Sequence, residues 1–72
     1  MAWREFAPFM SSNLSAVRYD PEQSLLEVEF LNGGRYQYYD VPEQVSLAFE
    51  QAESKGVFLA HSIKGHFRYS RV

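Results

Sequence analysis

The sequence contains no cysteine, so the fold can use neither a disulfide bond nor a thiolate metal ligand. It has no apolar run approaching the roughly 18 residues that a membrane span requires. Its first twelve residues include Arg4, Glu5 and Pro8, and they lack the continuous apolar stretch of a signal peptide. These absences favour a cytoplasmic protein that does not enter a membrane.

Catalytic motifs are missing as well. The sequence has no nucleophile elbow, no paired-carboxylate constellation and no glycine-rich phosphate loop. His61 and His66 are five residues apart, which is outside the i, i+4 spacing that places two imidazoles on one face of a helix. We therefore expect a protein that is not an enzyme and that has no catalytic residue, no metal site and no cofactor.

Aromatic side chains, by contrast, are abundant: six Phe, five Tyr and one Trp among 72 residues. Each buried ring removes about 150–250 Å² from water, so these side chains can form a core without a disulfide or a metal. We expect a single domain over residues 1–72. It divides into an N-terminal aromatic segment, residues 1–10, and a core region, residues 11–72.

A β-hairpin occupies the middle of the sequence. Residues 25–31 alternate between apolar and polar side chains, and after a turn with two glycines residues 35–39 form a second, aromatic run. Residues 13–19 alternate more weakly and are assigned to a preceding strand. The pattern predicts three consecutive antiparallel strands.

The register of the hairpin depends on its loop. A two-residue loop pairs Phe30 with Arg35 and mixes charges into both faces. A three-residue loop over residues 32–34, with Gly34 in the left-handed region, pairs Phe30 with Tyr36 and separates apolar from polar side chains. We predict the three-residue loop.

Helical signals follow the hairpin. Asp40 can cap a helix, Glu43 can reach back to it, and Pro42 suits the first turn. Gly56 is the expected left-handed end of this helix. The apolar positions that share its stripe, and are expected to cover the apolar face of the sheet, are Val41, Val45, Ala48, Phe49 and Ala52.

Later segments complete the predicted fold. Residues 57–63 are typical of a second short helix, and residues 66–71 alternate as a short terminal strand does. The expected class is α+β: a three-stranded antiparallel β-meander, an α-helix packed on one face, a second short helix and a short terminal strand, in the order β-β-β-α-α-β.

Several short motifs occur in order between residues 10 and 71, among them Val17-Arg18-Tyr19-Asp20-Pro21, Asn32-Gly33-Gly34, Tyr36-Gln37-Tyr38 and Ile63-Lys64-Gly65. In this order they resemble the KTSC domain family. The resemblance implies a small domain that occurs at the C-terminus of some lysyl-tRNA synthetases and as stand-alone bacterial and phage proteins. It also implies that Tyr36 and Tyr38 are the family's Tyr-x-Tyr motif, and it suggests RNA binding. The sequence departs from the family pattern at Ala60, where asparagine is expected, and at Arg18, where glycine is common.

Charge is distributed unevenly along the chain. Residues 20–53 hold eight acidic side chains against Arg35 alone, whereas residues 54–72 hold four basic side chains and no acidic one. The overall pI of about 5.6 excludes a uniformly basic nucleic-acid binder, but it leaves room for a local basic patch. The candidate RNA-binding residues are Lys64, Arg68, Tyr69 and Arg71, with His61 and His66 beside them.

Two interpretations of Tyr36 and Tyr38 compete. On an open sheet face they would offer rings on which bases stack. In the favoured register they lie beneath the helix and are mainly structural, and the opposite face carries Glu27 and Glu29, which suit a polyanion poorly. We expect the structural role.

A protein-interaction module is the alternative function. An aromatic-rich N-terminal segment contains Trp3, Phe6, Phe9 and Met10, which are of the kinds enriched in interfaces, and the acidic sheet face could meet a basic partner. Such a module would form a homodimer or bind a protein partner. It differs from the RNA-binding module in its oligomeric state and in its lack of salt-sensitive RNA retention.

Overall fold

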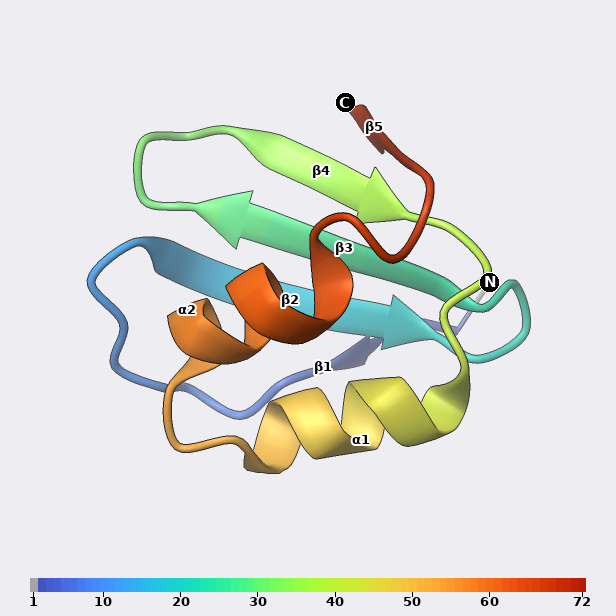
Figure 1. Ribbon diagram of the computed structural model, residues 1–72, viewed down its shortest axis with the longest axis horizontal. Coiled ribbons are helices and arrows are strands. Elements are labelled where there is room, and N and C mark those ends of the chain that lie inside the picture. The colour runs from blue at the N-terminus through green and yellow to red at the C-terminus, as the bar shows by residue number, and fades with distance from the viewer. Residues whose placement is uncertain (1) are drawn as a thin grey trace.

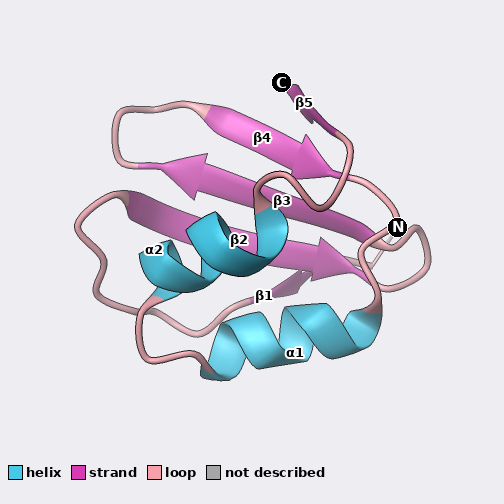
Figure 2. Cartoon of the chain, in the orientation of Figure 1, coloured by secondary structure: helices cyan, strands magenta, loops and turns pink. Residues whose placement is uncertain are grey.

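The computed structural model describes residues 2–72 as a five-stranded antiparallel sheet with its helices on one face (Figures 1 and 2). The strands β1 to β5 are adjacent in the sheet in the order in which they follow one another in the chain: Arg4–Glu5, Leu14–Asp20, Leu25–Phe30, Arg35–Tyr38 and Tyr69–Arg71. The helices α1 and α2 and the π-helical turn η1 lie between β4 and β5 in the chain, at Glu43–Gln51, Lys55–Phe58 and Leu59–Ile63. None of these helices is long and apolar enough to cross a membrane.

The α+β class and the central antiparallel meander agree with the prediction, but the sheet is larger than the predicted three strands. Strand β1 was not predicted at all, and β5 is the terminal strand expected within residues 66–71. Both form sheet edges, because β1 pairs with β2 and β5 pairs with β4. The sheet therefore extends the meander on both sides.

The predicted hairpin register is wrong by two residues. Val28 pairs with Tyr36, and the loop consists of residues 31–33. Gly33, not Gly34, adopts the left-handed conformation, with φ +92°. The side chain of Asn32 accepts a hydrogen bond from the amide of Gly34 at 2.9 Å, and this local turn sets the loop one residue earlier than predicted. A slip of two residues leaves every side chain on its predicted face.

Strand β2 also differs from simple alternation. Its register with β3 shifts between Leu14 and Ala16, which is the mark of a β-bulge. The shift moves Leu14 from the side of Ala16 to the side of Val17 and Tyr19, where all three are buried. The strand thus contributes one more apolar side chain to the core than its sequence pattern predicts.

The core lies between the sheet and the helices. Phe49 of α1 is fully buried, meets Phe6 edge-on at 5.3 Å between ring centroids, and stacks on Phe58 of α2 at 5.1 Å. Other buried apolar side chains come from every layer: Leu14, Val17, Tyr19, Leu26, Val28, Tyr38, Val41, Leu59 and Ile63. Aromatic contacts therefore join both helices to the N-terminal segment.

The start of α1 is not the predicted capping box. Pro42 is the N-cap residue, with no side-chain hydrogen bond, and Asp40 has φ +58° and forms an ion pair with Arg68 at 2.9 Å. Glu43 pairs with Arg4 at 3.1 Å. The carboxylates of Asp40 and Glu43 therefore pair with arginines instead of with the amides at the start of the helix.

The predicted apolar stripe of α1 needs one correction. Phe49 is buried and Val45 packs against the core, but Ala48 is exposed, and Ser46 is buried in its place. Arg4 explains the buried serine, because its guanidinium donates to the Ser46 hydroxyl at 3.0 Å. The inward face of α1 thus includes a polar contact to β1.

Gly56 does not end α1, as predicted, but lies inside α2. Helix α1 ends at Gln51, and Ser54 caps α2 by accepting a hydrogen bond from the amide of Val57 at 3.2 Å. A Cβ at position 56 would lie 2.9 Å from Oδ1 of Asn13, so close packing accounts for this glycine. The second helical segment starts two residues before the predicted range and ends at Ile63 as predicted.

Candidate functional site

A groove of about 590 Å³ lies on the helix side of the sheet, where β4 and β5 pass the end of η1. Its volume falls within the range of about 300–1,000 Å³ that is typical of small-ligand sites. The lining residues come from the hairpin, from the segment after η1 and from β5: Phe30, Asn32, Gly34, Tyr36, Tyr38, Lys64, Gly65, Tyr69 and Arg71.

The strand register brings the aromatic rings of the groove together. Tyr36 pairs with Arg71, and Tyr38 pairs with Tyr69, so these four side chains share one face of the sheet. The ring of Tyr69 lies 5.9 Å from that of Tyr36 and 5.7 Å from that of Tyr38, between centroids. Phe30 meets Tyr36 edge-on at 5.5 Å. The groove therefore has a continuous aromatic wall.

Two cations flank this wall. The Nζ of Lys64 lies 5.7 Å from the ring centroid of Phe30, and the Cζ of Arg71 lies 5.9 Å from that of Tyr36. Lys64 directly follows η1, and its amide donates to the carbonyl of Leu59 at 2.8 Å, a π-helical hydrogen bond. This hydrogen bond anchors the Lys64 backbone where the side chain reaches the groove.

The charges of Lys64 and Arg71 are uncompensated in the described part of the chain. Of the seven basic side chains, Arg4, Arg18, Arg35 and Arg68 form ion pairs with carboxylates, and Lys55 donates to the carbonyl of Ala52. Within residues 2–72, Lys64 and Arg71 have neither kind of partner. No carboxylate lines the groove either. The groove is therefore an electropositive hollow on a protein of net charge −2.

Tyr38 adds a neutral polar group to the floor. Burial is the main cause that raises the pKa of its hydroxyl above the ordinary value of 10.0, and the neighbouring Tyr69 and Tyr36 raise it further. The hydroxyl consequently stays protonated at neutral pH. It adds no negative charge that would oppose an anion.

The structure separates the candidate residues identified from the sequence. Lys64, Tyr69 and Arg71 line the groove. The side chain of Arg68 extends to Asp40 and to the ring of Tyr39, whose hydroxyl is hydrogen-bonded to Ser70. Because strand side chains alternate, Arg68 and Ser70 face away from Tyr69 and Arg71.

The two histidines do not line the groove. His61 lies within η1 and His66 follows it, and Nε2 of His66 is 3.0 Å from the carbonyl oxygen of His61. Across residues 2–72, no group of three His, Cys, Asp or Glu side chains could hold a metal ion.

Tyr36 and Tyr38 differ in burial. Tyr38 is 3% exposed and belongs to the core. Tyr36 is only half-buried and is part of the groove wall. Sequence reasoning weighed Tyr36 as a stacking residue but preferred a structural role, and it missed Phe30 and Gly34 as groove residues, although the aromatic alternation of the hairpin carried a signal for Phe30.

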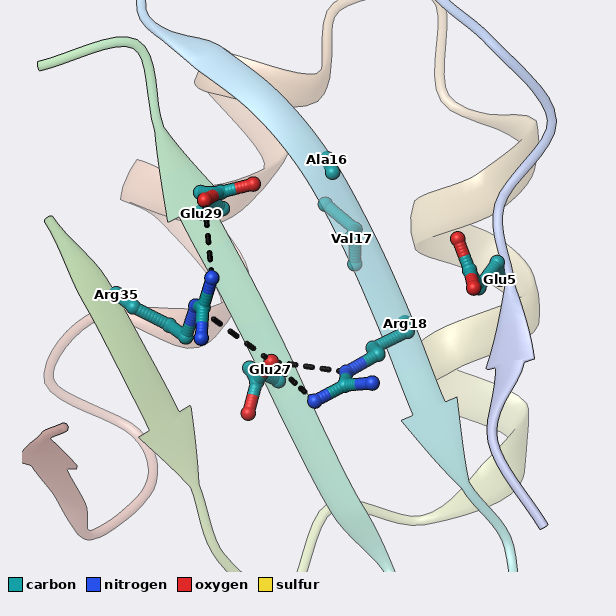
Figure 3. Close-up of a pocket in the computed structure, with 7 residues that line it drawn as sticks. All are labelled: Glu5, Ala16, Val17, Arg18, Glu27, Glu29 and Arg35. Carbon is teal, nitrogen blue, oxygen red and sulfur yellow. Dashed lines mark hydrogen bonds and ion pairs between the residues drawn. The ribbon is translucent and has the colours of Figure 1, made fainter. Parts of the chain in front are cut away.

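The opposite, helix-free face of the sheet is not the acidic surface that was predicted. Figure 3 shows Glu27 between two arginines from neighbouring strands: its Oε2 is 2.8 Å from Nη2 of Arg18 and 3.9 Å from Nε of Arg35. Arg35 also pairs with Glu29 at 3.2 Å. Gln37 donates to the other oxygen of Glu27 at 3.0 Å. Glu5 lies on the same face, so three carboxylates stand beside two guanidinium groups, and the negative charge is largely but not fully compensated.

The N-terminal aromatic residues are largely occupied by contacts within the protein. Phe6 is buried and Phe9 packs against the core. Trp3 lies under Arg18, whose Cζ is 4.1 Å from the centroid of its ring. Met10, which follows these aromatic residues, is almost fully exposed, at 95%.

Comparison with known proteins gives a consistent family assignment. The family model of the KTSC domain matches residues 10–67. A protein of Stutzerimonas stutzeri (strain A1501) is 44% identical over 63 residues, which cover 86% of this chain and 89% of that protein. The crystal structure of a KTSC domain protein from Yersinia pestis superposes with a TM-score of 0.90 at 38% identity and covers 99% of both chains.

Longer relatives contain the same domain as a small part. A lysine–tRNA ligase of Nostoc sp. (strain PCC 7120) is 38% identical over 61 residues, which cover 85% of this chain but 11% of the ligase. A lysine–tRNA ligase of Trichormus variabilis is 34% identical over 61 residues, again 11% of its length. The chain therefore corresponds to about one ninth of these ligases.

Proposed function

The chain belongs to the KTSC domain family, and on this premise we propose that it is a small accessory module that binds RNA or tRNA weakly through the groove and catalyses no reaction. The module acts in the cytoplasm. Its contact residues are the two groove cations, Lys64 and Arg71, together with the aromatic wall. Arg68 and the two histidines, which lie outside the groove, make no essential contact.

The observation that carries this proposal is the placement of the two uncompensated cations. The other basic side chains of this chain have a carboxylate or carbonyl partner, whereas Lys64 and Arg71 have none within residues 2–72. Both reach the same hollow. Phosphate groups supply the missing negative charge, because electrostatic contacts to phosphates dominate the affinity of proteins for nucleic acids.

The aromatic wall supports the same ligand class. Lys64 lies near the ring of Phe30 and Arg71 near that of Tyr36, and the ring of Tyr69 lies beside Tyr36. Nucleic-acid grooves that combine cations with aromatic rings bind the backbone and the bases together, and each stacked base contributes about 1–3 kcal/mol. The lysine–tRNA ligases that contain a similar segment also act on tRNA, as their name states.

The affinity is expected to be low and to depend on salt. Two phosphate contacts give a slope of about −1.4 for the logarithm of the affinity against the logarithm of the salt concentration, from about −0.7 per phosphate for single strands. Weak binding suits an accessory module that adds affinity to a larger assembly. When the module is held close to the RNA by that assembly, its high effective concentration compensates for the low affinity.

A salt titration tests this proposal. Fluorescence anisotropy with a short labelled RNA is measured between about 50 and 200 mM salt for the parent and for the double variant Lys64→Gln/Arg71→Gln. We expect the double variant to lose binding. Arg68→Gln is the matched control, because it removes a cation outside the groove, and it should retain binding. Loss of binding in Arg68→Gln but not in the double variant, or no retention of RNA by the parent at about 50 mM salt, would contradict the proposal.

The protein-interaction alternative draws less support from the surface. Phe6 and Phe9 pack inward, and Glu27 and Glu29 are paired with arginines. Sedimentation of the purified chain distinguishes the two functions. A discrete dimer, together with the absence of RNA binding, would favour the alternative.

A further inference from the structure

We propose that the groove receives a single unpaired nucleotide, whose base stacks on Tyr69 beside Tyr36 and whose phosphate lies between Lys64 and Arg71. This inference rests on the proposed RNA binding and specifies the form of RNA that is bound. It excludes a double helix as the preferred ligand.

The exposure of Tyr69 is the first observation. Its side chain sits in an aromatic cluster, within 6 Å of two other rings, yet 60% of the residue is exposed. Tyrosines with protein partners occur elsewhere on this chain: Tyr19 donates to the carbonyl of Val41, and Tyr39 is hydrogen-bonded to Ser70. Tyr69 instead presents a ring to the solvent at the side of an electropositive hollow.

The space in front of the rings is kept open by Gly34. This residue is buried, and a Cβ there would lie 3.2 Å from Oδ1 of Asn32, 3.7 Å from Cε1 of Tyr36 and 3.9 Å from Nη2 of Arg71. Any side chain would begin to fill the gap between the ring and the cation. The absence of a side chain at Gly34 therefore leaves room for part of a ligand to contact both the ring of Tyr36 and the guanidinium of Arg71.

The two cations are placed on different elements at opposite parts of the wall. Lys64 follows η1 and lies near Phe30, whereas Arg71 belongs to β5 and lies near Tyr36. Phe30 and Tyr36 are in edge-on contact, so the two positive charges flank one aromatic pair. This arrangement matches a nucleotide, in which a planar base and an anionic phosphate are joined by a sugar.

The shape of the site favours an unpaired base. In an A-form double helix each base is stacked between its neighbours, and proteins contact mainly the 2′-hydroxyls and phosphates. Stacking on the exposed ring of Tyr69 requires a base whose own face is uncovered, and a base that is splayed out of a helix meets this condition. A single-stranded segment, a loop or a chain end supplies such a base.

Three RNA ligands of related sequence test the inference: a short single strand, the same sequence in a blunt-ended duplex, and a hairpin whose loop contains that sequence. Binding is followed by anisotropy and by amide chemical shifts of the intact protein. We expect the single strand and the loop to bind at least about 10-fold more tightly than the duplex. Shifts should centre on β4, β5 and Lys64.

Substitutions separate stacking from charge. Tyr69→Leu keeps an apolar side chain but removes the aromatic face, and we expect it to weaken single-strand binding by about 5- to 150-fold without altering the salt slope. Tyr39→Leu is the matched control, because Tyr39 is an aromatic residue outside the groove, and it should bind like the parent. Dispersed amide spectra establish that each variant is folded.

The possible failures are distinguishable. Equal affinity for duplex and single strand, or unchanged binding in a folded Tyr69→Leu variant, overturns the unpaired-nucleotide inference and leaves RNA binding through the groove in place. Failure of the parent to bind any of the three RNAs overturns both proposals. Shifts confined to the face of Glu27 and Arg35 also overturn both, because the ligand would then lie on the other side of the sheet.

Discussion

The side-chain oxygen of Asn13 occupies the space in which a Cβ of residue 56 would lie, 2.9 Å from its ideal position. The same oxygen accepts a hydrogen bond from the hydroxyl of Ser11 at 3.1 Å. This contact joins the segment before β2 to helix α2. It also explains why a glycine stands inside a helix, where it is usually unfavourable.

We predict that Gly56→Ala depends on residue 13. Alanine favours the helix by about 1 kcal/mol over glycine, but in the parent its Cβ must displace the Asn13 side chain. In an Asn13→Ala background the collision is gone, and Gly56→Ala should be more stabilising than in the parent by at least about 0.5 kcal/mol. Urea unfolding of the four proteins in this cycle measures the coupling. Equal effects in both backgrounds would mean that the contact has no energetic consequence.

Phe49 is predicted to be the most sensitive core position. It is fully buried between Phe6 and Phe58, and Phe49→Ala should lower the free energy of unfolding by about 3–5 kcal/mol. That loss approaches the total stability of about 4–11 kcal/mol for a chain of this length. Phe30→Ala is the control, since Phe30 is only half-buried at the groove. A larger loss for Phe30→Ala in urea unfolding would contradict the placement of the core.

Glu27 should be more important for stability than Glu29. Its side chain is 8% exposed and accepts hydrogen bonds from Arg18 and Gln37, so Glu27→Gln should cost about 1–3 kcal/mol. Glu29→Gln removes an ion pair from a side chain that is 37% exposed, and it should cost about 0–1 kcal/mol. Thermal and urea unfolding compare the two variants. If their stabilities are equal, the network in Figure 3 contributes no more than a surface ion pair.

The raised pKa of Tyr38 predicts a loss of stability at alkaline pH. Its pKa is raised in the folded protein, mainly by burial, so above pH 10 the folded state holds the proton more tightly than the unfolded chain. The contribution of Tyr38 to the free energy of unfolding is therefore at its full value below pH 10.0 and is lost as the pH rises through the raised pKa of the folded state. Tyr38→Phe should make this decline shallower. Urea unfolding at a series of alkaline pH values tests it, and identical pH slopes for parent and variant would refute the assignment to Tyr38.

The faces of the central strands could be predicted from the sequence because side chains alternate with a period of two. Val28 and Tyr36 lie on the helix side and Glu27 on the other, as the pattern indicates. The register of the hairpin could not be predicted in this way, because the hydrogen bond from the Gly34 amide to Asn32 selects which glycine takes a positive φ. An alternation with a period of two residues does not distinguish between registers that differ by two residues.

The groove was only partly predictable for a different reason. The charge and aromatic character of three residues identified them as candidates from the sequence: Lys64, Tyr69 and Arg71. Their common location, however, depends on the pairing of β5 with β4. The same return places Arg68 on the other face. Likewise, Asp40 matches a helix cap locally, yet its ion pair with Arg68 is a tertiary contact that no local pattern contains.

The edges of the sheet have a consequence for behaviour at high concentration. A long, exposed edge strand is a template on which a second chain can pair and start aggregation. Here the strand at one edge has two residues and the strand at the other has three, whereas the three strands between them have four to seven. Each edge therefore offers few free backbone groups to another molecule. The short outer strands act as natural protection against edge-to-edge polymerisation of this aromatic-rich chain.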